Sequence, residues 1–271
     1  MKIRIIFLFM AFFAVTSAFA AGTQDAVSDA PFTISVGGST SVTPLMEALQ
    51  TEYANVRSNV RINISGTGSG DGITNAGVNY QIGMSSRNLT PAEQGRGLRE
   101  EVIAIDGIAV IVNRNNAVSN LTVEQIYGIY TGTITNWNQV GGRNAPIAVV
   151  SREVGSGTRS AFEEIVRFQG RLLVGANQLT STGAILANVS QNQYAIGYIS
   201  LGSVTDAVKA ISINGVAPTV ENVSRGAYRI ARSFIILTGS NVHPESTTFV
   251  DWILSPAGQA VVSRRGYISP R

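Results

Sequence analysis

The chain has 271 residues, 44% of them hydrophobic, and no cysteine, so it can bury the core of one large or two smaller domains but can form no disulfide. Its 20 Lys and Arg residues stand against 17 acidic residues, a formal charge of +3. We expect no nucleic-acid partner, because the sequence concentrates no basic stripe of the kind that a phosphate backbone requires.

The first twenty residues have the pattern of a secretory signal peptide. Lys2 and Arg4 precede an apolar run at residues 5–15, and residues 18–20 read AFA, the small-x-small form of a cleavage site. The apolar run is too short for a transmembrane anchor. We therefore expect cleavage near Ala20 and a periplasmic or secreted mature protein. Because no cysteine can carry a lipid, we expect that it is not a lipoprotein.

Residues 21–31 have the composition of a flexible polar leader. After it, short β-branched runs alternate with helical patterns, which predicts an α/β fold with mainly parallel strands. We expect strands at residues 33–36, 60–65, 102–113, 147–150, 195–199, 209–213 and 228–237. We expect helices at 44–56, 157–168, 183–191 and 246–264, the last disturbed at Pro256, and helix starts at the capping boxes of Thr90 and Thr122.

Two strand candidates are unusually long, EVIAIDGIAVIVN at residues 101–113 and YRIARSFIIL at 228–237, whereas ordinary strands run to about five or six residues. Strands of this length can serve two sheets, so we interpret them as connections between two domains. Domain I would take residues 32–107 plus 234–271, and domain II residues 108–233. We expect Asp106, within the first connection, to be a structural acceptor of the hinge.

Three segments rich in glycine and hydroxyl residues lie between a strand candidate and a helix candidate, and a fourth, at 82–87, leaves a short strand with paired serines. They read VGGSTSVTP at 36–44, SGTGSGDGI at 65–73, IGMSSR at 82–87 and SREVGSGTR at 151–159. Glycine lets backbone approach a ligand, and a helix start adds oriented N–H groups. Singly, each segment also fits an ordinary strand-to-helix turn. Since ligands of open α/β sheets collect beyond the carboxyl ends of strands, the four together predict a site for one small tetrahedral anion.

These segments, with AIDGIAVIVN at 104–113, resemble in order and spacing the periplasmic phosphate-binding proteins of bacterial phosphate ABC transporters. The resemblance covers residues 32–268, and Arg152 followed by Ser156-Gly157-Thr158 is its most specific part. It implies a two-domain periplasmic-binding-protein fold of type II, with two crossover strands forming a hinge. The function implied is capture of inorganic phosphate in the interdomain cleft for delivery to a membrane ABC permease. We expect a monomer with no enzymatic activity, cofactor or metal site.

The resemblance also implies which residues contact phosphate. Carried over residue by residue, they are Thr40, Ser41, Ser69 and Ser86 from domain I and Arg152, Ser156, Gly157 and Thr158 from domain II, with Ser39, Asp71 and Arg87 as further candidates.

This sequence departs from the family pattern at two positions. Many relatives have aspartate where this chain has Ser86, and that carboxylate accepts the proton of hydrogen phosphate and so rejects sulfate. In this chain the candidate acceptors of that proton are Asp71 and Ser86. Relatives also often carry an acid two residues past the arginine, where this chain has Val154. Glu153 lies next to it, so the partner of Arg152 is open as well.

The sequence leaves three alternative functions open. The missing aspartate favours a receptor for another tetrahedral oxyanion, such as sulfate or arsenate. A secreted hydrolase of phosphate esters could use the same anion pocket, although the only histidine, His243, has no evident acidic partner for a Ser-His-Asp triad. A surface protein for adhesion or signalling is the third.

Overall fold

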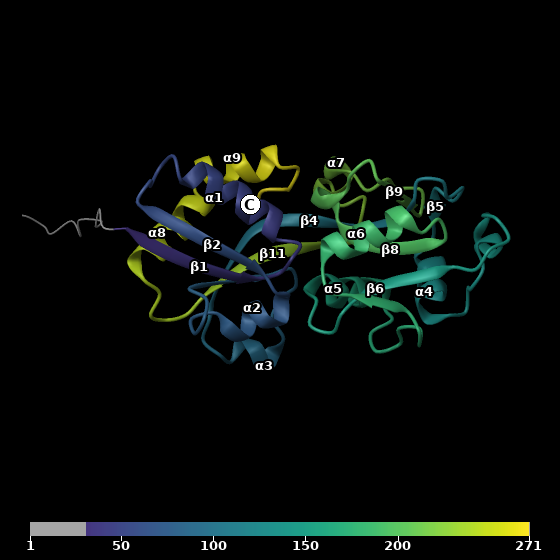
Figure 1. The fold of residues 1–271 in the computed structure, drawn as a ribbon, viewed down its shortest axis with the longest axis horizontal. Coiled ribbons are helices and arrows are strands. Elements are labelled where there is room, and N and C mark those ends of the chain that lie inside the picture. Colours follow the sequence, from purple (N-terminus) through teal and green to yellow (C-terminus); the bar gives the residue numbers. More distant parts are fainter. Residues whose placement is uncertain (1–30, 271) are drawn as a thin grey trace, which may run out of the picture.

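The computed structural model describes residues 31–270, so the expected signal peptide at 1–20 and the leader, apart from its last residue, lie outside the described residues. Figure 1 shows two lobes joined by β4 (Arg99–Asn113) and β11 (Ala231–Thr238), the two long strands. Among residues 31–270, none of the helices combines the length and the apolar composition that a membrane span requires.

Lobe 1, drawn in purple, blue and yellow in Figure 1, holds the first and last elements of the chain. They are β1 (Phe32–Gly38), α1 (Thr43–Tyr53), β2 (Val60–Gly66), α2 (Ser69–Asn75), β3 (Ile82–Ser85), α3 (Pro91–Gln94), α8 (Pro244–Leu254) and α9 (Pro256–Arg264). The capping box predicted at Thr90 is confirmed: its hydroxyl accepts from the N–H of Glu93, whose carboxylate accepts from the N–H of Thr90.

Lobe 2 holds the middle of the chain. Its elements are β5 (Asn120–Leu121), α4 (Val123–Thr131), β6 (Ala148–Arg152), α5 (Gly157–Val166), β7 (Asn177–Leu179), α6 (Thr182–Gln191), β8 (Ala195–Ser200), β9 (Val208–Ala210), β10 (Ser212–Ile213) and α7 (Val220–Ser224), with 3₁₀ turns at Trp137–Val140 and Leu201–Ser203. The capping box predicted at Thr122 is confirmed at the start of α4.

One mixed sheet runs through both lobes in the order β2-β1-β3-β11-β4-β8-β6-β7, with β9 also paired to β4. The strands are parallel at the two ends, where β2, β1 and β3 pair in one lobe and β7, β6 and β8 in the other. They are antiparallel in the centre, where β11 pairs with β3 and β4, and β4 pairs with β8. The expectation of mainly parallel strands is therefore wrong for the centre of the sheet.

Two predicted elements are each divided in the structure, and one predicted strand begins three residues later than expected. The strand expected at 209–213 is two strands, because β9 pairs with β4 while β10 pairs with β5. The strand expected from residue 228 begins at Ala231, since the backbone N–H of Tyr228 donates to the Asn222 carbonyl in α7 at 2.9 Å. The helix expected at 246–264 is two helices, because Pro256 holds Ser255 in an extended conformation (φ −69°, ψ 164°).

The buried side chains form separate cores in the two lobes. The core of lobe 1 draws on residues between 34 and 104 and between 234 and 267, and includes Leu45, Phe234 and Phe249. The fully buried residues of the main core of lobe 2 lie between residues 108 and 230. Within this core Phe162 stacks on Tyr198, with 4.1 Å between the ring centroids. The change from one core to the other falls within the two crossover strands. The domain limits at 107/108 and 233/234 remain a prediction.

Candidate functional site

The first hydroxyl-rich loop turns at the end of β1. Gly38 has φ +134°, and a Cβ there would lie 2.3 Å from the Met84 carbonyl oxygen, so glycine is required at this position. The Ser39 N–H donates to that same carbonyl at 3.0 Å. The chain then enters α1 with the side chains of Ser39 and Ser41 almost completely buried. The loop is thereby fixed beside the end of β3.

Three serines of lobe 1 meet at the ends of β1 and β3 and the start of α2. Ser39 Oγ donates to Ser86 Oγ at 2.9 Å, and the Ser86 N–H donates to Ser69 Oγ at 3.0 Å. The Ser69 and Ser86 hydroxyl oxygens are 3.3 Å apart. Ser39, Ser69 and Ser86 are each no more than 2% exposed. The structure therefore brings these three predicted residues together, and we call them the serine cluster.

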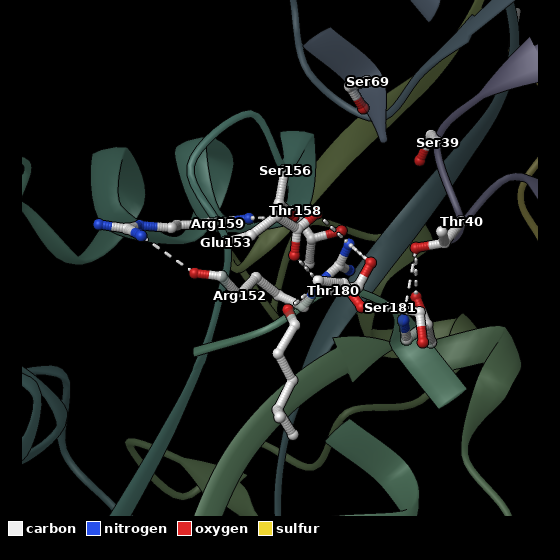
Figure 2. Close-up of polar contacts among 12 residues, drawn as sticks. Ser39, Thr40, Ser69, Arg152, Glu153, Ser156, Thr158, Arg159, Thr180 and Ser181 are labelled. Atoms are coloured by element: carbon white, nitrogen blue, oxygen red, sulfur yellow. Dashed lines mark hydrogen bonds and ion pairs between the residues drawn. The ribbon is translucent and has the colours of Figure 1, made fainter. Parts of the chain in front are cut away.

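The hydroxyl-rich segment at residues 151–159 brings the start of α5 from lobe 2 to the serine cluster. Ser156 is the N-cap of α5, and its Oγ accepts from the Arg159 N–H at 3.2 Å. A Cβ placed on Gly157 would lie 2.3 Å from Ser69 Oγ and 2.7 Å from Ser86 Oγ. In Figure 2, Ser156 and Thr158 lie on one side, and Ser39, Thr40 and Ser69 on the other. The lobes are thus closed on each other, and only glycine fits at residue 157.

A second group of hydroxyls, Thr40 and Ser41 from lobe 1 and Thr158 and Thr182 from lobe 2, also crosses between the lobes. Ser41 Oγ lies 2.8 Å from Thr158 Oγ1 and 3.1 Å from Thr182 Oγ1, and Thr40 Oγ1 lies 3.3 Å from Thr182 Oγ1. Thr182 was not among the predicted site residues. The run Thr180-Ser181-Thr182 before a helix was the available signal, since it repeats the hydroxyl-rich strand-to-helix pattern of the other loops.

Arg152 is buried beside these groups and has Glu153 as its ion-pair partner. Its side chain is 2% exposed, and Nε and Nη2 each donate to a Glu153 carboxylate oxygen at 2.8 Å. The carbonyls of Leu179 and Thr180 accept weaker bonds from the same nitrogens, at 3.3 and 3.5 Å. Val154 is 85% exposed. The question left open by the sequence is thus settled: the residue next to the arginine supports it.

Tyr198 supports Arg152 from β8. Its Oη lies 2.8 Å from Ser151 Oγ and accepts from the Arg152 N–H at 3.3 Å. Burial raises the pKa of Tyr198 to about 12, so the hydroxyl keeps its proton. The strand end that carries the guanidinium is therefore held by a neutral, fully buried hydroxyl.

Two of the further candidates lie apart from the serine cluster. Asp71 accepts from Thr67, Asn75 and Tyr80 at 2.5, 2.7 and 2.9 Å, all within lobe 1, so local donors occupy both of its carboxylate oxygens. The Arg87 guanidinium donates twice to Glu93, at 2.7 Å each. The geometry therefore supports local structural roles for Asp71 and Arg87, whereas Ser39 joins the cluster.

His243 has a structural position at the start of α8. Its Nδ1 accepts from the Glu245 N–H at 3.2 Å, and its ring stacks on Phe32 at 3.9 Å. Within residues 31–270, no group of three or more His, Asp or Glu residues is placed to hold a metal ion.

The assembled site offers hydroxyls from four loops, the N-termini of α5 and α6 and one buried guanidinium with its carboxylate partner. Helix N-termini and hydroxyls donate hydrogen bonds to an anion without adding a full positive charge. The chemistry fits a small oxyanion held by many short hydrogen bonds.

Comparisons with known proteins point to the same chemistry. Residues 16–257 match the sequence profile of the PBP superfamily domain. Phosphate-binding protein PstS of Borreliella burgdorferi is 31% identical over 249 residues, which cover 87% of this chain and 89% of that protein. A protein of Clostridium perfringens, described as a phosphate ABC transporter substrate-binding protein and solved with bound phosphate, is 44% identical, with a TM-score of 0.86 over 88% of this chain and 100% of that chain. An ABC-type phosphate transport receptor of Vibrio cholerae is 38% identical, with a TM-score of 0.72 over the same shares.

Proposed function

This chain belongs to the PBP superfamily and, within it, to the phosphate-binding proteins of ABC transporters, and on this premise we propose that it captures inorganic phosphate between its lobes for delivery to a membrane ABC permease. Its relatives are binding proteins, which supports a role without catalysis.

The observation that carries the proposal is the contact of the α5 start with the serine cluster. Residues from lobe 1 and lobe 2 meet there, so an anion at this point would be held from both sides only when the lobes are closed. Such a ligand stabilises the closed state by its differential affinity for it. We assign the phosphate contacts to Thr40, Ser41, Ser69 and Ser86 in lobe 1 and to Arg152, Ser156, Gly157 and Thr158 in lobe 2.

Position outside the cytoplasmic membrane follows from the same role, because a substrate-binding protein presents its ligand to the outer side of an ABC permease. The pattern at residues 1–20 supports export with cleavage near Ala20, and the lack of cysteine supports a protein without a lipid anchor.

Calorimetric titration tests the function directly. The protein, freed of bound anion, is titrated with phosphate and then with sulfate at pH 6 and pH 8, and is incubated separately with p-nitrophenyl phosphate. We expect one phosphate per chain, no heat from sulfate and no nitrophenol. Sulfate binding of comparable affinity would mean that the ligand is not phosphate alone. Ester hydrolysis that disappears in Ser156→Ala would point to an enzyme. Binding of neither anion would refute the proposed function.

A further inference from the structure

We propose that Thr182 is a positioning residue that slows phosphate release by holding Thr40 and Ser41 to lobe 2 in the closed state. The inference rests on the proposed function, since it assigns a kinetic role within the same site. Thr182 stands at the start of α6, outside the four loops that carry the assigned phosphate contacts.

The hydrogen bonds of the Thr182 N–H and hydroxyl reach across the lobes. Its N–H donates to Thr40 Oγ1 at 3.3 Å, and its Oγ1 lies 3.3 Å from Thr40 Oγ1 and 3.1 Å from Ser41 Oγ. The partners are 141 and 142 residues away in the chain. Ser181 is the N-cap and bonds the Ala184 N–H, which leaves the Thr182 N–H, one of the unpaired donors of a helix start, available for Thr40. Thr182 itself is 6% exposed.

The four hydroxyls form a linear chain in the order Thr40, Thr182, Ser41, Thr158. Three contacts join them, and each hydroxyl has one proton to donate. Three of the four protons fill the three contacts, and when these contacts all run in one direction the fourth proton is free at the end to which the chain points. Both ends are assigned phosphate contacts. An anion that accepts this last proton therefore orients the whole chain, and every inner hydroxyl then both donates and accepts.

This arrangement couples the ligand to closure. Hydrogen bonds that run in one direction along a chain polarise and strengthen one another. Thr182 occupies an inner place, so a side chain without a hydroxyl at this position divides the chain and removes both hydroxyl contacts between α6 and lobe 1. Because these contacts form only in the closed state, their loss speeds opening, whereas capture of phosphate by the open state is unaffected.

The rates of phosphate release and capture test this role. Radiolabelled phosphate is bound to the wild type, Thr182→Val, Thr182→Ser and Ser190→Ala and is chased with unlabelled phosphate. Ser190 is the matched control, because its hydroxyl lies on the same helix and bonds only the local Ala187 carbonyl. We expect Thr182→Val to release phosphate roughly tenfold faster, the gain expected from losing two neutral hydrogen bonds. We expect unchanged capture rates and near wild-type release from Thr182→Ser and Ser190→Ala.

Release from Thr182→Val at the wild-type rate, or release from Thr182→Ser as fast as from Thr182→Val, would overturn the inference alone. A wild type that binds no phosphate would overturn the proposed function and the inference with it. Thr182→Ala gives the same test with a smaller side chain if the valine variant does not fold. Thermal unfolding of each variant separates a positioning role, which leaves stability nearly unchanged, from a general loss of structure.

Discussion

Asp106 and Arg232 form an ion pair between the two crossover strands, with Asp106 Oδ2 and Arg232 Nη2 3.1 Å apart and both side chains at most 3% exposed. Asp106 Oδ1 also accepts from Ser200 Oγ at 2.9 Å. The pair therefore ties β4, β11 and the end of β8 together where the lobes join. This is the structural role in the hinge that the sequence predicted for Asp106.

Asp106→Asn should lower the free energy of unfolding by about 3–5 kcal/mol, because it leaves the Arg232 guanidinium buried without a countercharge. Chemical denaturation measures the loss. The double variant Asp106→Asn with Arg232→Met should recover part of it, since no charge then remains buried. Glu221→Gln is the control, because Glu221 and Arg225 form an exposed pair that should contribute less than about 1 kcal/mol. A loss below 1 kcal/mol in Asp106→Asn would contradict this account.

Arg152→Ala should weaken phosphate binding by about 2–5 kcal/mol, because the dianion would lose a buried charged partner while Glu153 would be left unpaired. Arg152→Lys should give an intermediate loss, since an ammonium keeps the charge but cannot reproduce the two bonds to Glu153. Calorimetry measures both, with Arg61→Ala on exposed β2 surface as the control. An affinity equal to that of the wild type would remove Arg152 from the site.

Local chemistry made helix starts and much of the site predictable. The capping boxes at Thr90 and Thr122 and the hydroxyl-rich loops depend on residues within a few positions of one another, so the sequence displays them. The same is true of the candidate residues in the serine cluster, since each follows a strand candidate.

The features of the site that the sequence did not predict depend on contacts between distant segments of the chain. Thr182 meets Ser41 only when the lobes close, and no local pattern encodes that meeting. Asp71 has the residue type of an acceptor, but Thr67, Asn75 and Tyr80 occupy its oxygens once the second loop has folded. The partner of Arg152 depends on which of two adjacent side chains turns towards it beyond the end of β6, and the turn at residues 154–155 places Glu153 there and leaves Val154 exposed.

Gly157→Ala should keep the lobes from closing fully, because the added Cβ would meet Ser69 Oγ and Ser86 Oγ well inside contact distance. We expect at least a tenfold loss of phosphate affinity, which is about 1.4 kcal/mol, and a smaller compaction on adding phosphate, measured by small-angle X-ray scattering. Gly183→Ala is the matched control near the start of α6, where a Cβ meets only Ser181 Oγ at 4.0 Å. Wild-type affinity and compaction in Gly157→Ala would exclude the tight closure described here.

Selectivity for phosphate over sulfate should respond to Ser86 and not to Asp71. The Ser86 hydroxyl lies in the serine cluster, so it can accept the proton of hydrogen phosphate, whereas local donors hold the Asp71 carboxylate. Titration of Ser86→Ala with both anions should therefore show a reduced preference for phosphate, and Asp71→Asn should show the wild-type ratio. The reverse result would restore Asp71 as the acceptor, the other choice that the sequence left open.

Glu93 should give the unfolding free energy a specific acid dependence. Two hydrogen bonds from Arg87, followed by those from Thr90, lower the pKa of the Glu93 carboxyl to about 2 from an ordinary value of 4.5. A carboxyl whose pKa is lower in the folded state stabilises the protein fully above pH 4.5 and loses that contribution as the pH falls towards 2.

The difference in unfolding free energy between the wild type and Glu93→Gln should therefore be constant from pH 7 to about pH 5 and shrink below pH 4.5. Denaturation at pH 7, 5, 4 and 3 measures it. In an Arg87→Met background the same difference should change much less with pH, because the largest cause of the lowered pKa is gone. If the difference were the same at pH 7 and pH 3, the contacts of Glu93 with Arg87 and Thr90 would stabilise the protein through packing and not through the charge of the carboxylate.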